Sequence, residues 1–238
     1  MKRIGPKTKL ADIINLNYQV VPLLNRFDIF FGFGDKTVEH VCAEKNINQD
    51  FFVEIINAFL DREFYPRENL QKFQLKLIVD YLRKTHTYYL ENKIPRIERL
   101  INELIENCCD SNIAKVSLIQ KFYHEFKNEI TEHINFEDNI FYPFVLKVEK
   151  LYTNNESTQN LEDFPFVEYT EEHSNVEGKI NDLKNLIIKY IPIERNIETA
   201  NELLYQLFEF EKDLQDHQRI EDRVLVQKLK RMTKELGL

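Results

Sequence analysis

The sequence predicts an all-α protein, an up-down-up-down four-helix bundle preceded by a small helical N-terminal domain. Only 5 glycines and 7 prolines occur among 238 residues, so few turns and long helices are expected. Beyond residue 65, four long stretches carry apolar residues at helical spacing. Because the connections between them are short, consecutive helices should pack as antiparallel neighbours.

The first expected domain covers residues 1–65, with about four short helices between residues 10 and 64. Apolar runs that begin at Leu10 and Tyr18 predict the first two helices. Thr37 is a suitable N-cap for the third, and residues 46–48 read as a turn before the fourth. The boundary is expected at Tyr65, because the following proline disfavours a helical conformation there.

Three phenylalanines, Phe30, Phe31 and Phe33, surround two glycines in a predicted turn of this domain. At least some of these rings should be covered, either by the bundle or by a second chain. Rings left exposed would mark an interaction patch. The sequence therefore predicts a protein partner or a homodimer contact through the N-terminal domain.

The second expected domain covers residues 66–238. Its helices are predicted at about residues 69–107, 112–150, 165–190 and 195–235, with a polar loop at 153–163. One apolar stripe of the first helix consists of Leu75, Ile78, Leu82, His86, Leu90, Ile94 and Ile97. Pro95 and Pro143 lie inside two of these helices, where each should produce a bend.

One histidine of each long helix occurs at a comparable position along the bundle: His86, His133, His173 and His217. A helix with its loop returns the chain to the same height, so these four side chains are expected at one level of the core. Glu137 and Glu221 each follow a histidine by four residues and share its helix face. These six residues are the predicted metal ligands.

Glu177 follows His173 at the same spacing. It could be an additional ligand, an acceptor that orients His173, or one more acid on a charged helix. His124 falls on the opposite helix face from His133, so it is predicted at the surface. His40 has no Glu or His partner at helical spacing, so it is predicted at the surface or an interface. Cys108 is about 33 Å beyond His86 along an unbroken helix and should lie outside the site.

Imidazole ligands together with bridging carboxylates suit iron, and bundle cores commonly hold di-iron or di-manganese sites. We therefore expect two iron ions per chain, bridged by Glu137 and Glu221. Manganese and then zinc are the less favoured metals.

The histidine motifs resemble the hemerythrin-like, HHE cation-binding domain over about residues 70–235. The residues that carry this resemblance are His86, His133, Glu137, Asp138, Phe141-Tyr142-Pro143, Glu172-His173, His217, Glu221 and Asp222. Residues 10–64 resemble the small N-terminal domain of the iron-sulfur repair di-iron family (repair-of-iron-centres, or ScdA-like), through residues 27–36 and on to Cys42. The resemblance implies a non-haem di-iron protein that acts in nitric oxide or oxidative stress, or in iron-sulfur cluster repair, and binds O2 or NO.

Two positions depart from the families that the chain resembles. The repair family carries an adjacent cysteine pair in the N-terminal turn, where this chain has Gly32-Phe33. Oxygen-carrying hemerythrins have a second histidine at the position of Glu177. These departures argue against a thiol-based role of the N-terminal domain and against simple oxygen carriage.

Composition restricts the remaining choices. A formal net charge of -8 disfavours nucleic-acid binding, and residues 1–65 hold eight Lys and Arg against nine Asp and Glu. Three cysteines do not form a disulfide framework, and no run of 18 apolar residues occurs, so a cytoplasmic protein without a membrane span is expected. Two alternatives remain: a gas or redox sensor with a helix-turn-helix-like unit at residues 37–60, and a metal-free interaction bundle.

Overall fold

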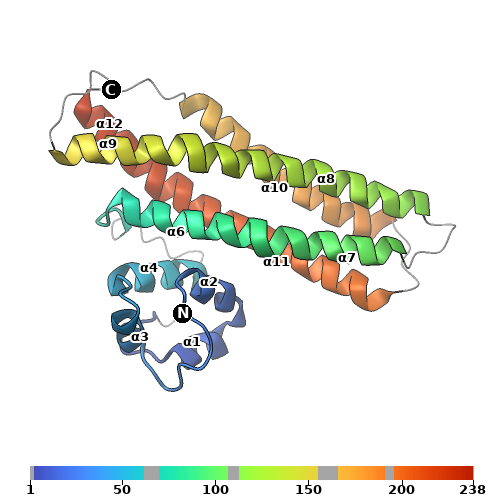
Figure 1. Cartoon of the computed structure of the whole chain (residues 1–238), viewed down its shortest axis with the longest axis horizontal. Coiled ribbons are helices and arrows are strands. Elements are labelled where there is room, and N and C mark those ends of the chain that lie inside the picture. The colour runs from blue at the N-terminus through green and yellow to red at the C-terminus, as the bar shows by residue number, and fades with distance from the viewer. Residues whose placement is uncertain (1–2, 62–69, 107–112, 155–165, 191–195, 238) are drawn as a thin grey trace.

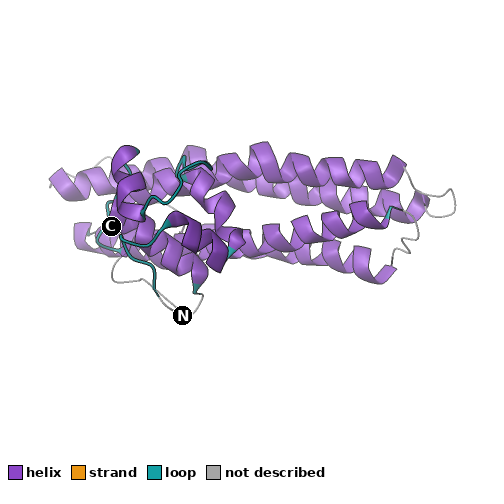
Figure 2. Ribbon diagram, turned by 90° about the horizontal axis from the view of Figure 1, so that it is seen from below, coloured by secondary structure: helices purple, strands orange, loops and turns teal. Residues whose placement is uncertain are grey.

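The computed structural model describes residues 3–61, 70–106, 113–154, 166–190 and 196–237, without the side chains of residues 113–116 and 166–177. Within these ranges the chain forms helices and no strand (Figure 2). The predicted all-α class is therefore confirmed. No described helix is long and apolar enough to cross a membrane.

The N-terminal unit, which we define as residues 3–61, consists of short helices. They are α1 (Leu10–Leu16), the 3-10 turn η1 (Tyr18–Val20), α2 (Val21–Arg26), α3 (Val38–Glu44) and α4 (Gln49–Leu60). Thr37 occupies the N-cap position of α3, as predicted. Asn48 begins α4, because its side chain accepts a hydrogen bond from the N–H of Phe51 at 3.0 Å. The predicted turn at residues 46–48 thus also caps a helix.

Four long helical rods follow, close to the predicted ranges. The first is α6 (Leu75–Tyr88), η2 (Tyr89–Lys93) and α7 (Ile94–Glu106); the second is α8 (Ile113–Phe136), η4 (Glu137–Phe141) and α9 (Tyr142–Asn154); the third is α10 (Phe166–Tyr190); the fourth is α11 (Ile197–Ile220), η5 (Glu221–Val226) and α12 (Gln227–Leu236). Figure 1 shows the rods lying side by side. Helix α7 contacts α8 and α11, and α10 contacts the same two helices, so four helices enclose a common core.

Three π-helical turns, η2, η4 and η5, interrupt the rods. The backbone N–H of Ile94 bonds to the carbonyl of Tyr89, and that of Tyr142 bonds to Glu137, five residues back in each case. Pro95 and Pro143 come directly after these bonds, where a proline nitrogen could not have continued the α-helical pattern. At each of the two prolines, where a bend is predicted, the helix contains a π-helical turn with one extra residue. Such turns are frequent at functional sites.

Two apolar clusters divide the core along its length. The first combines the N-terminal unit with α6, α9 and α12, and the second fills the bundle between α7, α8, α10 and α11. Three polar residues fall between them: His86 between Leu82 and Tyr89, Glu137 between Ile134 and Phe141, and His217 between Leu214 and Ile220. A buried polar layer therefore separates the two clusters.

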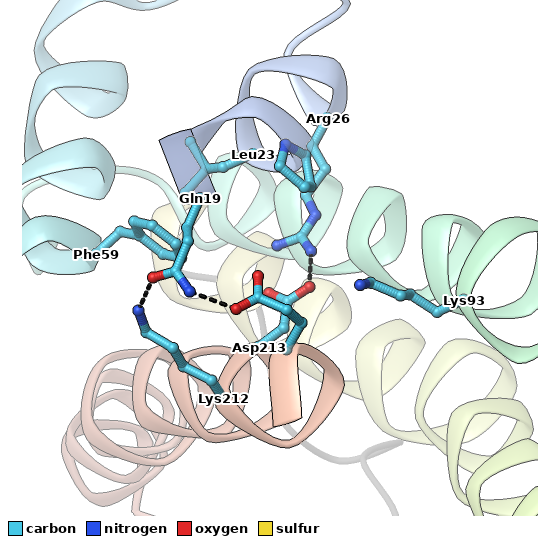
Figure 3. A pocket seen from close by; sticks show the side chains of 9 residues that line it. Gln19, Leu23, Arg26, Phe59, Lys93, Lys212 and Asp213 are labelled. Atoms are coloured by element: carbon cyan, nitrogen blue, oxygen red, sulfur yellow. Dashed lines mark hydrogen bonds and ion pairs between the residues drawn. The ribbon is translucent and has the colours of Figure 1, made fainter. Parts of the chain in front are cut away.

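The N-terminal unit lies alongside α6, at the end of the bundle formed by α9 and α12 (Figures 1 and 2). It also contacts α11 through polar side chains. Gln19 bonds to Glu209 and Lys212, and Arg26 forms a buried ion pair with Asp213 (Figure 3). Residue 65 is outside the described residues, so the division of the chain into domains 1–65 and 66–238 stays a prediction.

The three phenylalanines of the N-terminal turn differ in exposure. Phe33 packs against the first apolar cluster, so one of the rings is covered as expected. Phe30 and Phe31 are 64% and 74% exposed. These two rings form the predicted kind of exposed aromatic patch.

Candidate metal centre

The polar layer brings together side chains from three rods. His86 comes from α6, Glu137 from the first position of η4, and His217 from the last turn of α11. One potential ligand atom of each lies within 4.8 Å of the others. All three side chains are buried, and Glu137 is fully so. A buried carboxylate needs partners of opposite charge or strong hydrogen bonds, which the imidazoles provide here.

Glu137 faces two different imidazoles. Its Oε2 lies 3.1 Å from Nε2 of His86, and its Oε1 lies 3.0 Å from Nε2 of His133. The two oxygens of this carboxylate are therefore directed at histidines of different rods. A carboxylate in this position can bind two cations, one through each oxygen.

Glu221 stands on the other side of the layer, as the first residue of η5. Its Oε2 lies 3.6 Å from Nε2 of His217, and its Oε1 accepts a hydrogen bond from the hydroxyl of Tyr142 at 2.7 Å. Tyr142 also stacks on the ring of His86 with 5.6 Å between ring centroids. The tyrosine thus fixes a carboxylate of the fourth rod while covering an imidazole of the first.

A second carboxylate orients His86. Oδ1 of Asp138 lies 3.0 Å from Nδ1 of this histidine, which leaves Nε2 directed at Glu137 and His217. Arg83 in turn donates a hydrogen bond to the backbone carbonyl of Asp138 at 2.9 Å. An imidazole held by a carboxylate through one nitrogen is the usual arrangement for a histidine that binds metal through the other.

The two central histidines have opposite proton affinities. Burial disfavours the charged form of His86, but hydrogen bonds to Asp138 and Glu137 outweigh it and raise its pKa to about 9. Burial, together with the neighbouring charge of His86, holds the pKa of His217 well below its usual range. Because the two Nε2 atoms are 3.2 Å apart, a positive charge on His86 disfavours a second positive charge on His217.

The donor atoms fit a transition metal. Two ligand atoms bound at about 2.1 Å and at roughly right angles to each other lie about 3 Å apart. The separations from Nε2 of His86 are 3.1 Å to Glu137 and 3.2 Å to His217. Imidazole nitrogen and carboxylate oxygen are donors that iron, manganese and zinc accept.

Comparison with protein families gives an independent result. The model of the hemerythrin HHE cation-binding domain matches residues 77–229. The chain belongs to the hemerythrin HHE cation-binding family. No curated protein matches the chain. The matched range of the hemerythrin domain includes every residue of the layer described above.

The predicted site residues can now be located within the hemerythrin domain. The structure brings His86, His133, Glu137, His217 and Glu221 into one layer. His173 and Glu177 belong to α10, but their side chains are outside those described. Their predicted roles therefore stay predictions.

The remaining predicted residues of the chain lie elsewhere. His40 and His124 are exposed, as predicted. Nδ1 of His40 bonds to the hydroxyl of Thr37 at 2.8 Å. Cys42 is a buried free thiol, whereas Cys108 and Cys109 are outside the described residues.

Sequence reasoning missed the roles of Asp138 and Tyr142 in the hemerythrin domain. Asp138 directly follows Glu137 and therefore points to a different side of the rod, toward His86 of the first rod. Tyr142 is five residues beyond Glu137 and would leave that face in a regular α-helix. The π-helical turn absorbs one residue and returns it to the core. The signal available in the sequence was Pro143, which indicates an irregular helix there.

Proposed function

We propose that this protein is a non-haem di-iron protein that binds a small diatomic molecule, NO or O2, in the response to nitric oxide or oxidative stress. Repair of iron-sulfur clusters is the other process in which such a protein would act. The observation that carries the proposal is Glu137, a fully buried carboxylate whose two oxygens face the imidazoles of His86 and His133.

In this proposal Glu137 and Glu221 bridge two metal ions, and His86, His133, His173 and His217 complete their coordination, with Glu177 as a further candidate. Iron is favoured because imidazole ligands with two carboxylates set to bridge suit a dinuclear di-iron site, whereas a single zinc ion needs no bridge. Bound iron would supply redox chemistry and an open position for the diatomic ligand. The chain's own contribution is to hold the donors in a buried layer, oriented by Asp138 and Tyr142.

The proposal includes the predicted architecture: an up-down-up-down bundle with an N-terminal domain of the repair type. The exposed pair Phe30 and Phe31 supports a protein partner or a second copy at that domain. Light scattering on the full chain and on the Phe30→Ser/Phe31→Ser variant tests the second copy. A dimer that dissociates in the variant supports it, and a monomeric wild type excludes it.

A DNA-binding regulator is the less favoured alternative. Helices α3 and α4 are joined by a short turn, as in a helix-turn-helix, but the sequence of α4 contains Asp50 and Glu54 and no Lys or Arg. Most of its apolar side chains are buried in the first cluster. Phosphate contacts require basic groups, which this helix lacks.

The proposal is tested by anaerobic iron loading of the full chain, followed by exposure to NO and separately to O2. We expect about two irons per chain and a change in the visible spectrum with each gas. A protein that retains no metal after loading would instead support the metal-free interaction bundle. Stoichiometric zinc with no iron would contradict the redox role.

A further inference from the structure

A cleft of about 420 Å³ opens between the N-terminal unit and α6, outside the metal layer. One wall carries Lys45 and Ile47, from the turn between α3 and α4. The other carries Leu77, Arg83 and Lys84 of α6. Sites for small molecules commonly have volumes of about 300–1,000 Å³ and often lie between structural units.

The inner surface of the cleft is aromatic and aliphatic. Phe27 stacks on Tyr81 at 5.5 Å between ring centroids, and Phe51 meets Tyr81 edge-on at 6.1 Å. These three rings are nearly buried, whereas Ile47 and Leu77 are half-buried and accessible from the opening. The accessible part of the inner surface is therefore apolar and backed by rigidly packed rings.

The rim carries the cations Lys45, Arg83 and Lys84 and the carboxylates Asp28 and Asp80, of which Asp80 pairs with Lys76. Lys45 and Lys84 are exposed, and Arg83 is half-buried between them and the bundle. Lys84 pairs with Asp28, but Lys45 has no carboxylate partner among the described residues and lies 5.8 Å from the ring of Phe30. The cleft thus offers an uncompensated ammonium group on a protein whose formal net charge is -8.

Arg83 is fixed before any ligand arrives. Its guanidinium bonds to the carbonyl of Asp138, and its Nε lies 3.7 Å from Oδ1 of the same residue. It also lies over the ring of Tyr142, 5.7 Å from the centroid. A guanidinium has five N–H donors, so these contacts leave donors for an anion. A cation held in place loses less conformational entropy on binding a ligand than a mobile side chain does.

Two residues of the cleft wall have an unusual backbone conformation. Asp28 and Asn46 adopt positive φ angles of 57° and 53°. A positive φ angle is energetically unfavourable for residues other than glycine, and such residues cluster at active sites and ligand-binding sites. Here they shape the turns after α2 and α3, both on the wall formed by the N-terminal unit.

We propose that this cleft binds a small organic anion with a planar apolar group. The planar group would contact Leu77 and Ile47, and the carboxylate, sulfonate or phosphate would contact Lys45 and Arg83. The site requires neither bound metal nor the gas chemistry proposed above, so the two proposals fail or hold independently.

The test uses anilinonaphthalene sulfonate, a fluorescent anion with planar rings, titrated against the full-length protein. We expect saturable binding at one site. Lys45→Gln should weaken it about tenfold, because a charge-assisted contact contributes about 1.5 kcal/mol. The control is Lys36→Gln, an exposed lysine of the same unit that pairs with Glu44 away from the cleft. It should leave the affinity unchanged.

Two further measurements locate the bound dye and test its charge. Leu77→Trp fills the cleft and should abolish binding while circular dichroism shows a folded protein. Phenylnaphthylamine, a neutral compound with similar rings, should bind more weakly than the sulfonate. Equal affinities of the two dyes, equal effects of the two lysine variants, or full binding to Leu77→Trp would each overturn the proposal.

Discussion

The guanidinium of Arg26 and the carboxylate of Asp213 form a buried ion pair that joins the N-terminal unit to α11. Their side chains are 3% and 12% exposed. Asp213 lies one helical turn before His217, and Arg26 also stands over the ring of Tyr89, which packs edge-on against that histidine. The side chains that attach the N-terminal unit to α11 therefore also contact residues packed against His217 of the metal layer.

Replacement of one partner of this pair should strongly destabilise the protein. Arg26→Met leaves the Asp213 carboxylate buried without its cation, which typically costs about 3–5 kcal/mol. The double variant Arg26→Met/Asp213→Leu removes both charges and should recover most of that loss. The measurement is the free energy of unfolding from urea titrations. If the double variant lost the sum of the two single effects, the pair would not be coupled.

Much of this fold could be predicted because helix periodicity and capping are local properties. The inward stripe of the first rod was correct at Leu82, His86 and Ile94. It was wrong at one step: Tyr89 is fully buried, whereas the predicted Leu90 is only partly so. The π-helical turn η2 inserts one residue and so shifts the inward-facing positions. A prediction that assumes a constant period of 3.6 residues per turn does not include such an insertion.

Asp138→Asn should weaken metal binding without removing the site. The amide can still accept or donate a hydrogen bond to His86 but no longer stabilises its orientation with a negative charge. Loss of such an orienting group typically costs about 10–100-fold in metal affinity. Competition with a chelator measures it. Asp222→Asn is the matched control, because Asp222 also follows a site glutamate but makes no hydrogen bond to an imidazole among the described residues.

Tyr142→Phe removes the hydroxyl that binds Glu221. A fully buried carboxylate would then lose a hydrogen bond at 2.7 Å, at a cost of about 1–3 kcal/mol. We expect that loss in the unfolding free energy of the metal-free protein. Tyr152→Phe, on the same helix, removes a hydroxyl that bonds to Glu235 at the surface and should change stability by less than about 0.5 kcal/mol. Similar effects of the two variants would contradict a special role of Tyr142.

The candidate site was predictable to the extent that ligands follow helical spacing. His133 and Glu137 share a face because they are four residues apart, and the same holds for His217 and Glu221. The height of the histidines on different rods follows from the length of each helix and its loop, but hydrogen bonds between particular side chains of different rods follow no helical spacing. The hydrogen bond from Tyr142 to Glu221 joins positions 79 residues apart, and only the packing of the rods brings them together.

Cys42 should be nearly inert to alkylation in the folded protein. Burial raises the pKa of its thiol to about 11, and the thiolate is the reactive form. At pH 8 only about one in a thousand thiols with a pKa of about 11 is ionised. The measurement is iodoacetamide labelling of a Cys108→Ser/Cys109→Ser variant, with and without urea. Rapid labelling without urea would show that the thiol is accessible.

Glu137→Gln and Glu177→Gln test which carboxylates hold the metals. Glutamine keeps the shape of Glu137 but cannot bridge two cations as an anion does, so metal content should fall far below that of the wild type. Glu177→Gln should keep about two metals per chain if Glu177 only orients His173, with an affinity loss of about 10–100-fold. Metal analysis after identical loading compares the three proteins. Equal losses would make Glu177 a ligand, and an undiminished metal content in Glu137→Gln would exclude the bridge.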